Sequence, residues 1–156
     1  MQPVHALSSR LPIVLLALAT LVVPAAHAKQ GDTFSEADFR GDYSFAFDGV
    51  LILEGQPVPI AASGQVEADG DGNATDFVRV VNLGGSLVLR QEGFGSYWVN
   101  PDGTGSAEFT VITVDPPDTF PDSTETFDFT ITGNRRKLQF ISTTPGTVAR
   151  GLVVKQ

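Results

Sequence analysis

The chain has 156 residues, of which 18 are acidic and 10 basic, so its formal net charge is −8 at pH 7. The sequence contains no Cys, which excludes disulfides, thiolate zinc sites and iron–sulfur clusters. The acidic balance argues against nucleic acid or an anionic membrane surface as a partner, and the length fits a single domain.

The first 28 residues have the pattern of a cleaved export signal. A polar start that ends in Arg10 is followed by the apolar run Leu11–Val23, then by Pro24 and small residues. A helix that spans a membrane needs about 20 apolar residues, so this run is too short for a permanent anchor. The order is that of a secretory signal and resembles bacterial ones. We therefore expect cleavage after residue 28 and a periplasmic or extracellular protein; the alternative is an uncleaved, amphiphilic N-terminus.

Both histidines, His5 and His27, lie in this expected signal. The mature chain would therefore contain no His, no Cys and no Met. It could not hold a Ser-His-Asp or Cys-His nucleophile system, a histidine zinc site or a haem with the usual axial ligands. Residues 29–40 are expected to form a polar lead with at most one helical turn, and residues 41–156 a single β-domain.

From Gly41 onward, apolar and polar residues alternate with a period of two, which predicts strands with one face in a core and one in water. Tyr43 and Phe45 begin the first such series. No part of residues 29–156 shows a sustained helical stripe. Eight strands are predicted, over residues 42–53, 57–69, 73–83, 86–100, 105–114, 123–132, 136–143 and 147–155. Most turns are short and rich in Gly, Asn and Asp, as hairpins require.

Eight sequential strands joined by tight turns can close into an antiparallel up-and-down barrel or form a meander β-sandwich. We favour the barrel, because closure removes the exposed strand edges. At eight strands the interior of a barrel is either filled by side chains or holds one small ligand. What occupies the middle of this domain is therefore the main functional question.

Two arginines lie within apolar strands and are candidates for ligand binding. Arg79 and Arg90 could each point into the lumen and pair with a carboxylate of a ligand. Arg79 shares its phase with Phe77 and Val81, whereas the opposite phase is also apolar, so its direction stays open. The alternative for either residue is an outward Arg that pairs with an acid on the next strand.

Aromatic residues are the other candidates for contact with a ligand. Tyr43 and Phe45 would line the lumen of a barrel. Tyr97 and Trp98 are adjacent and must point to opposite faces of their strand. If Tyr97 faces the core, Trp98 is exposed and, with Phe94 nearby, could form a contact patch for a sugar ring or a protein.

One turn resembles the start of an EF-hand loop. Asp69, Asp71 and Asn73 place oxygen ligands at alternate positions, which suits Ca²⁺. The twelfth position of the loop should be Glu, however, and it is Val80. We expect a plain acidic hairpin turn and no cofactor, with Ca²⁺ as the alternative.

Carboxylates could still perform acid–base chemistry without histidine if one of them faced the lumen, where desolvation raises a carboxyl pKa. The candidates are Glu54, Glu67, Glu92 and Glu108. Glu67 and Glu108 fall on the polar phase of their strands, so solvent exposure is expected for them, and Glu92 stays ambiguous.

Three motifs carry a resemblance to known proteins: the Gly-x-Tyr-x-Phe opening at 41–45, the Asp-Gly-x-Gly-Asn turn at 69–73 and the Tyr-x-Val-Asn-x-Asp-Gly-x-Gly hairpin at 97–105. Together they resemble a group of bacterial secreted proteins of unassigned function. The expected barrel is also similar in outline to calycin and allene-oxide-cyclase barrels, an analogy of fold alone. The resemblance implies a fold and no catalytic residues.

Three functional hypotheses follow. The first is a binding module that holds a small apolar or carboxylate ligand in its lumen. The second is a non-enzymatic structural or interaction protein of the cell surface, with a filled barrel and an apolar patch near Trp98. The third is a cyclase or isomerase that confines a substrate beside a buried carboxylate. Neither nucleic acid nor, after signal cleavage, a membrane is expected as a partner.

Overall fold

The computed structural model describes residues 33–117, 119–132 and 135–156. The expected export signal lies outside these residues. In the described part of the chain, no helix is long and apolar enough to cross a membrane.

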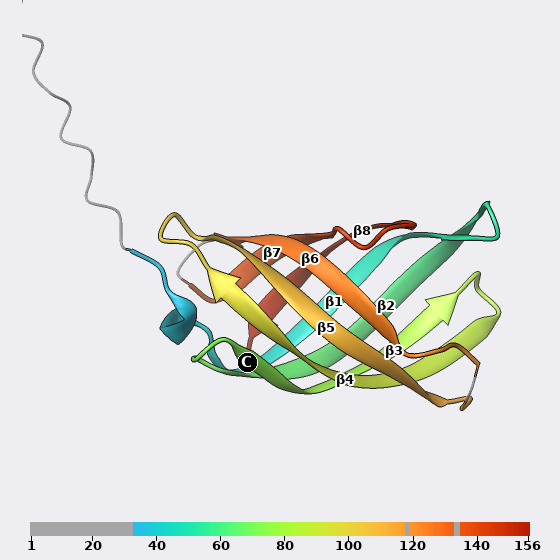
Figure 1. The fold of residues 1–156 in the computed structure, drawn as a ribbon, viewed down its shortest axis with the longest axis horizontal. Helices are drawn as coiled ribbons and strands as arrows, with labels where there is room; N and C mark the ends of the chain where they lie inside the picture. The colour runs from blue at the N-terminus through green and yellow to red at the C-terminus, as the bar shows by residue number, and fades with distance from the viewer. Residues whose placement is uncertain (1–32, 118, 133–134) are drawn as a thin grey trace, which may run out of the picture. The chain divides into compact units, whose positions relative to one another are not determined.

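Eight antiparallel strands form a closed barrel (Figure 1). Each strand pairs with its neighbours in sequence, and β1 pairs with β8 to close the barrel. In chain order the elements are the 3-10 turn η1 (Glu36–Asp38), β1 (Arg40–Leu53), β2 (Gln56–Asp69), β3 (Asn73–Leu83), β4 (Leu87–Val99), β5 (Thr104–Asp115), β6 (Ser123–Thr132), β7 (Lys137–Ser142) and β8 (Thr147–Lys155). The up-and-down barrel is confirmed, the sandwich is excluded, and no predicted strand end differs from the observed one by more than two residues.

The apolar side chains that alternate along each strand point into the barrel. Alternation along β1 buries Tyr43, Phe45 and Phe47. The buried side chains form two clusters. One contains Phe39, Tyr43, Ala68, Ala74, Tyr97, Val99, Phe129, Ile131 and Leu138. The other contains Phe45, Phe47, Ala62, Phe77, Val81, Leu89, Val111 and Ala149.

Glycines on the inner face let several phenylalanine rings lie across the neighbouring strand. Gly64 is opposite Phe45 in the register, and a Cβ built on Gly64 would lie 2.6 Å from that ring. The other pairs of this kind are Gly93 with Phe77, Gly95 with Phe109, Gly105 with Phe129 and Gly151 with Phe140. A strand glycine marks such a close approach and also eases curvature. The same glycines therefore allow the sheet to bend and make room for the aromatic side chains of the core.

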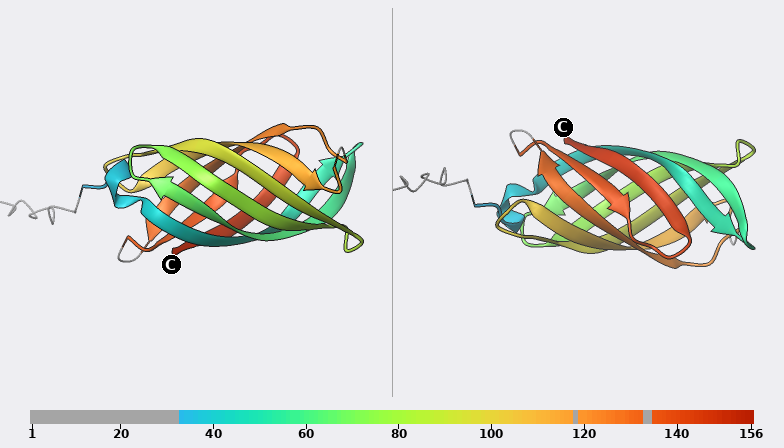
Figure 2. Two further views of the ribbon diagram at one scale, coloured as in Figure 1. Left: turned by 90° about the horizontal axis from the view of Figure 1, so that it is seen from below. Right: turned by 90° about the horizontal axis from the view of Figure 1, so that it is seen from above.

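The barrel has two different ends. At the first, which we call the closed end, η1 lies beside the turns that follow β2 and β4 (Figure 2), and Phe39 belongs to the buried cluster of this end. The chain ends at the same end, after β8. At the second, the open end, lie the turns that follow β1, β3, β5 and β7. The two buried clusters lie toward these two ends, and the space between and above them positions the candidate site.

Candidate functional site

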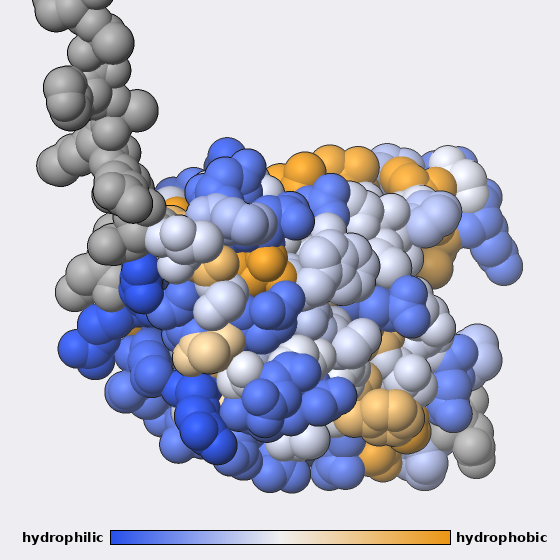
Figure 3. Space-filling model, turned by 60° about the vertical axis from the view of Figure 1, so that its left-hand side comes forward, coloured by the Kyte–Doolittle hydropathy of each residue, from blue (hydrophilic) through white to orange (hydrophobic). Residues whose placement is uncertain are grey.

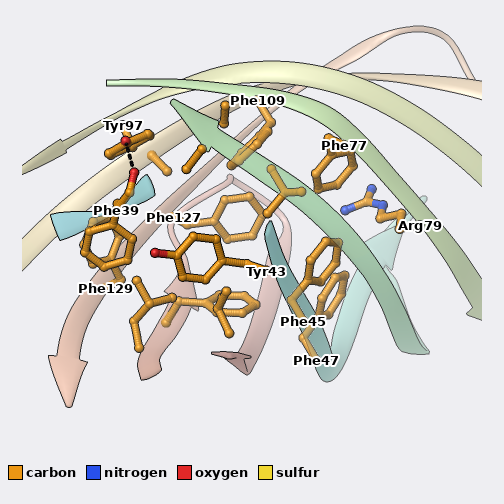
Figure 4. Close-up of a pocket in the computed structure, with 17 residues that line it drawn as sticks. Phe39, Tyr43, Phe45, Phe47, Phe77, Arg79, Tyr97, Phe109, Phe127 and Phe129 are labelled. Atoms are coloured by element: carbon orange, nitrogen blue, oxygen red, sulfur yellow. Dashed lines mark hydrogen bonds between the residues drawn. The ribbon is translucent and has the colours of Figure 1, made fainter. Parts of the chain in front are cut away.

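The lumen contains a cavity of about 110 Å³. Strands from all around the barrel contribute to its lining, in which aromatic rings predominate (Figure 4). The lining residues are Phe39, Tyr43, Phe45, Phe47, Val66, Ala68, Ala74, Phe77, Arg79, Tyr97, Ala107, Phe109, Phe127, Phe129, Leu138, Phe140 and Val153. For comparison, an engineered apolar cavity of about 150 Å³ in another protein stays dry and binds benzene. The lumen is therefore of the size that suits one small ring.

The lining of the cavity combines stacked aromatic rings with small side chains. The rings of Phe45 and Phe77 stack with centroids 5.3 Å apart, and those of Phe77 and Phe109 are 4.9 Å apart. By contrast, Ala68 and Ala74 are opposite each other in the register of β2 and β3. Two alanines side by side leave room that the surrounding rings do not fill.

Arg79 points into the barrel and is only 6% exposed. Its Nη1 and Nη2 donate to the two carboxylate oxygens of Glu125, at 2.7 and 2.5 Å. Its Nε donates to Oε1 of Gln91 at 2.8 Å, and Nε2 of Gln91 donates to Oγ1 of Thr113 at 3.0 Å. The guanidinium carbon also lies 5.7 Å from the ring centroid of Phe47. The charge of Arg79 is thus neutralised and hydrogen-bonded inside the protein.

This network changes what the lumen can bind. An inward arginine without a partner would attract a carboxylate, as the sequence suggested for Arg79. Here Glu125 from the same chain already makes the two-pronged contact that a guanidinium offers a carboxylate. A ligand carboxylate would have to displace Glu125 and leave it uncompensated, which is costly in a buried setting. The geometry therefore favours an uncharged ligand.

A second cavity, of about 230 Å³, lies at the open end. Its wall is mostly apolar, with Leu51, Ile60 and Leu89 among its residues. Arg79, Phe47 and Phe127 line both cavities, so the Arg79 network forms the boundary between the lumen and the open end. Together the two spaces fall just above the lower end of the range for ligand pockets, about 300 Å³.

The two tyrosines of the chain are both buried at the closed end but differ in their hydrogen bonding. The hydroxyl of Tyr97 donates to the carbonyl of Phe39 at 2.7 Å and accepts from the N–H of Gly70 at 3.0 Å. The hydroxyl of Tyr43 has no hydrogen-bond partner among the described residues. Burial raises the pKa of both groups, that of Tyr43 to about 12. Both therefore keep their protons at neutral pH.

The other residues predicted for ligand binding are divided between the two faces of the barrel. Phe45 lines the lumen with Tyr43 and Tyr97. Arg90 instead lies on the outer face, where its Nε is 3.9 Å from a carboxylate oxygen of Asp115 on the next strand. This is the outward arrangement that the sequence left open, and it removes Arg90 from the lumen.

Trp98 also lies on the outer face and is half exposed, as expected once Tyr97 faces inward. Phe94 is exposed on the same strand, with the exposed Ser96 between them. The outer face presents its other apolar side chains in a similarly scattered way. Figure 3 shows a side on which hydrophilic residues predominate and apolar ones form small patches.

Three members of the buried network, Glu125, Gln91 and Thr113, were missed by the sequence analysis. The phase of Glu125 was informative, because Glu125 lies on the same side of β6 as Phe127 and Phe129, which point inward. The four acids considered from the sequence, Glu54, Glu67, Glu92 and Glu108, are all exposed. Glu125 occupies the place that a catalytic carboxylate would need, but Arg79 engages both its oxygens.

The predicted Ca²⁺ ligands lie in the turn between β2 and β3. The carboxylate of Asp69 accepts hydrogen bonds from the side chain and backbone of Asn73 and from the backbone of Asp71. These bonds, the side-chain bond from Asn73 first, hold the pKa of Asp69 below its usual value. Among the described residues, no group of three or more His, Cys, Asp or Glu side chains could hold a metal ion. Both the plain turn that we expected and the alternative of Ca²⁺ binding stay untested.

The fold and the site define a small, closed antiparallel barrel with an aromatic lumen. No protein-family model matches the chain, and no curated protein matches it significantly. Among solved structures it is similar to one described as a redesigned beta barrel, mFAP1, bound to DFHBI. The sequence identity is 15%, the TM-score is 0.49, and the match covers 77% of this chain and 97% of that one. This degree of similarity supports no conclusion about function.

Proposed function

We propose that this protein is a binding module that holds one small, uncharged and mostly apolar molecule inside its barrel. The observation that carries the proposal is the lumen cavity of about 110 Å³, lined mainly by aromatic side chains. A barrel that served only as a scaffold would gain stability by filling this space, since each unfilled volume forgoes packing contacts. The cavity is therefore best explained by a ligand that completes the core.

The charge of the open end supports an uncharged ligand. Arg79 is neutralised by Glu125, so it offers no net positive charge to an incoming anion. The four turns at the open end contain no Lys or Arg, and Glu54 and Asp122 are exposed there. An anion that approached this end would meet like charge. The carboxylate alternative is for these reasons the weaker one.

Export belongs to the same proposal. The signal pattern of residues 1–28 would place the module in the periplasm or outside the cell, where it would meet small molecules directly. The mass of the protein recovered after secretion tests this independently of binding. A chain that begins at Lys29 agrees with the proposal, and an intact N-terminus on the exported protein contradicts it.

A second candidate is an interaction protein of the cell surface. The exposed Trp98 and Phe94 on the outer face of β4 favour it, because aromatic side chains are common at protein contacts. In this case the lumen would be irrelevant to function. Filling the lumen would then leave the partner bound, whereas replacing Trp98 would release it.

Binding to the lumen can be tested with benzene as the probe and a variant that fills the cavity. Ala107 lines the cavity, so Ala107→Leu occupies space that the ligand needs. Ala46 is exposed on the outer face of β1, and Ala46→Leu is the matched control. The full chain is expected to show saturable shifts of lumen methyl signals in NMR spectra as benzene is added. Ala107→Leu should abolish these shifts without lowering the unfolding midpoint, and Ala46→Leu should retain them.

Two results would overturn the proposal: no saturable shift in the wild-type protein, or unchanged binding in Ala107→Leu. If Ala107→Leu does not fold, Ala74→Val fills part of the same cavity from β3 with a smaller side chain. It should weaken benzene binding at least several-fold for the same reason.

A further inference from the structure

The hydroxyl of Tyr43 is a polar group without a partner in an apolar interior. Tyr43 is only 2% exposed, and its oxygen accepts or donates no hydrogen bond within the described part of the chain. Buried polar groups are almost always hydrogen-bonded, so each exception calls for an explanation. One explanation is that a missing molecule supplies the partner.

The position of this hydroxyl ties it to the lumen. Tyr43 lines the cavity, and its ring packs against that of Phe39 with centroids 5.8 Å apart. Figure 4 shows the phenol oxygen among the lining side chains, at the side of Phe39 and Phe129 and away from Arg79. A molecule that fills the cavity would therefore lie against the ring that carries this hydroxyl.

A water molecule is a poor occupant of this site. A buried water needs two to four polar partners. Besides Tyr43, the lining contains only Tyr97 and Arg79 as polar side chains. Tyr97 is engaged with the backbone, and Arg79 with Glu125 and Gln91. Tyr43 alone cannot satisfy a water, whereas an apolar molecule with one polar atom needs only that single contact.

The hydroxyl of Tyr43 is suited to donate. Burial, together with the nearby Tyr97 and Asp38, holds its pKa at about 12, so the proton stays in place at any physiological pH. A phenol O–H in this state offers its one proton to an acceptor. The complementary ligand atom is then an uncharged oxygen.

We infer that the ligand of the lumen is a compact ring with one hydrogen-bond acceptor, a ketone or ether oxygen, that takes the O–H of Tyr43. This inference rests on the proposed function, since it names the class of molecule that the cavity would hold. It assigns two roles to the lining: the phenylalanine rings hold the hydrocarbon body, and Tyr43 selects molecules with an oxygen at one place.

The test compares two probes of nearly the same shape, cyclopentanone and methylenecyclopentane, in which C=CH₂ replaces C=O. Affinities are measured by NMR titration for the full wild-type chain and for Tyr43→Phe. Loss of one hydrogen bond should weaken cyclopentanone binding by about tenfold. Binding of methylenecyclopentane should change less than twofold, because the hydrocarbon makes no use of the hydroxyl. The bound carbonyl carbon should also move downfield in the wild-type protein and not in Tyr43→Phe.

Trp98→Phe is the control, since it alters an aromatic side chain that is half exposed on the outer face of β4 and does not line the lumen. It should leave the ratio of the two affinities unchanged. If both probes bind and Tyr43→Phe alters neither affinity, the inference is overturned while the proposed function stands. If neither probe binds the wild-type protein, the proposed function fails and the inference fails with it. Retained binding of methylenecyclopentane by Tyr43→Phe shows that this variant is folded.

Discussion

The two ends of the barrel satisfy the polar groups of their most buried side chains in different ways. At the closed end, the buried hydroxyl of Tyr97 bonds to the backbone of Phe39 and Gly70. Toward the open end, the buried guanidinium of Arg79 bonds to the side chains of Glu125 and Gln91. The first arrangement joins β4 to the segment before β1 and to the turn after β2, and the second joins β3 to β4 and β6 beside a cavity.

The two ends also differ in how their side chains pack. The closed end is sealed by η1 and by the ring of Phe39, which contacts the rings of Tyr43, Tyr97 and Phe129. At the open end, Phe120 from the loop after β5 packs against the buried cluster and lines the cavity there, and the cavity of about 230 Å³ remains. Substitutions at the two ends should therefore have different consequences, and the following experiments measure them.

The largest loss of stability is expected when Phe39 at the closed end is replaced. Phe39→Ala removes a buried ring that three aromatic neighbours surround, and such a change costs about 3–5 kcal/mol of unfolding free energy. Urea denaturation measures this loss. Phe94→Ala, on the exposed outer face, is the control and should change the stability by less than about 0.5 kcal/mol. Equal effects of the two substitutions would show that η1 and Phe39 do not seal the barrel.

The next largest loss of stability is expected when the hydrogen-bond network of Arg79 is disrupted. Glu125→Leu leaves the buried guanidinium of Arg79 uncompensated and should cost about 3 kcal/mol, at the low end for such pairs because Glu125 is partly exposed. Replacing both residues, as in Arg79→Met with Glu125→Leu, should recover most of this loss, because an apolar pair of similar size carries no desolvation penalty. Additive losses in the double variant would contradict this account of the network.

Substitutions of the two tyrosines are expected to change the stability by intermediate amounts, and the two variants can be compared directly. Tyr97→Phe leaves the N–H of Gly70 without its acceptor and removes the donor to the carbonyl of Phe39. This should lower the free energy of unfolding by about 1–3 kcal/mol. Tyr43→Phe removes a hydroxyl that has no partner in the described structure, so it should leave the stability of the ligand-free protein unchanged or higher. Paired thermal unfolding curves test the contrast. A larger loss in Tyr43→Phe than in Tyr97→Phe would mean that its hydroxyl is bonded within the protein.

The smallest loss of stability is expected when the protein is acidified. Backbone and side-chain donors lower the pKa of Glu36, Asp69 and Asp102, through Val99, Asn73 and Thr104 respectively. A carboxyl with a lowered folded pKa stabilises the protein above its unfolded pKa, about 4, and this contribution is lost as pH falls through the folded value. All three lie at the closed end. The amide protection factors of Val99, Asn73 and Thr104, which correct for the intrinsic slowing of exchange in acid, should therefore fall below about pH 4, before those of mid-strand amides; a uniform fall in protection would contradict this.

The strands of this fold could be predicted because alternation and turn residues are local signals. The pairing of β1 with β8 joins residues about a hundred positions apart, and only the disadvantage of open edges pointed to it. The direction of the arginines was harder. Arg79 and Arg90 both sit among apolar neighbours, since Val78 and Val80 are apolar yet exposed on the outer face. Closure of the barrel decides which phase is inside.

The site was only partly accessible from the sequence. The inward phase of Glu125 could have been read from Phe127 and Phe129, but its pairing with Arg79 depends on contact across the barrel between β3 and β6. The unpartnered hydroxyl of Tyr43 is a property of its surroundings and leaves no trace in the sequence. A cavity likewise results from the sum of many side-chain volumes.

The central claim is that the lumen holds a small uncharged molecule, and a crystal structure of the full exported protein soaked in cyclopentanone tests it most directly. The account predicts ring-shaped density inside the lumen, with the carbonyl oxygen about 3 Å from the hydroxyl of Tyr43. Phenylalanine rings packed into the lumen, with no density for the ketone, would contradict it.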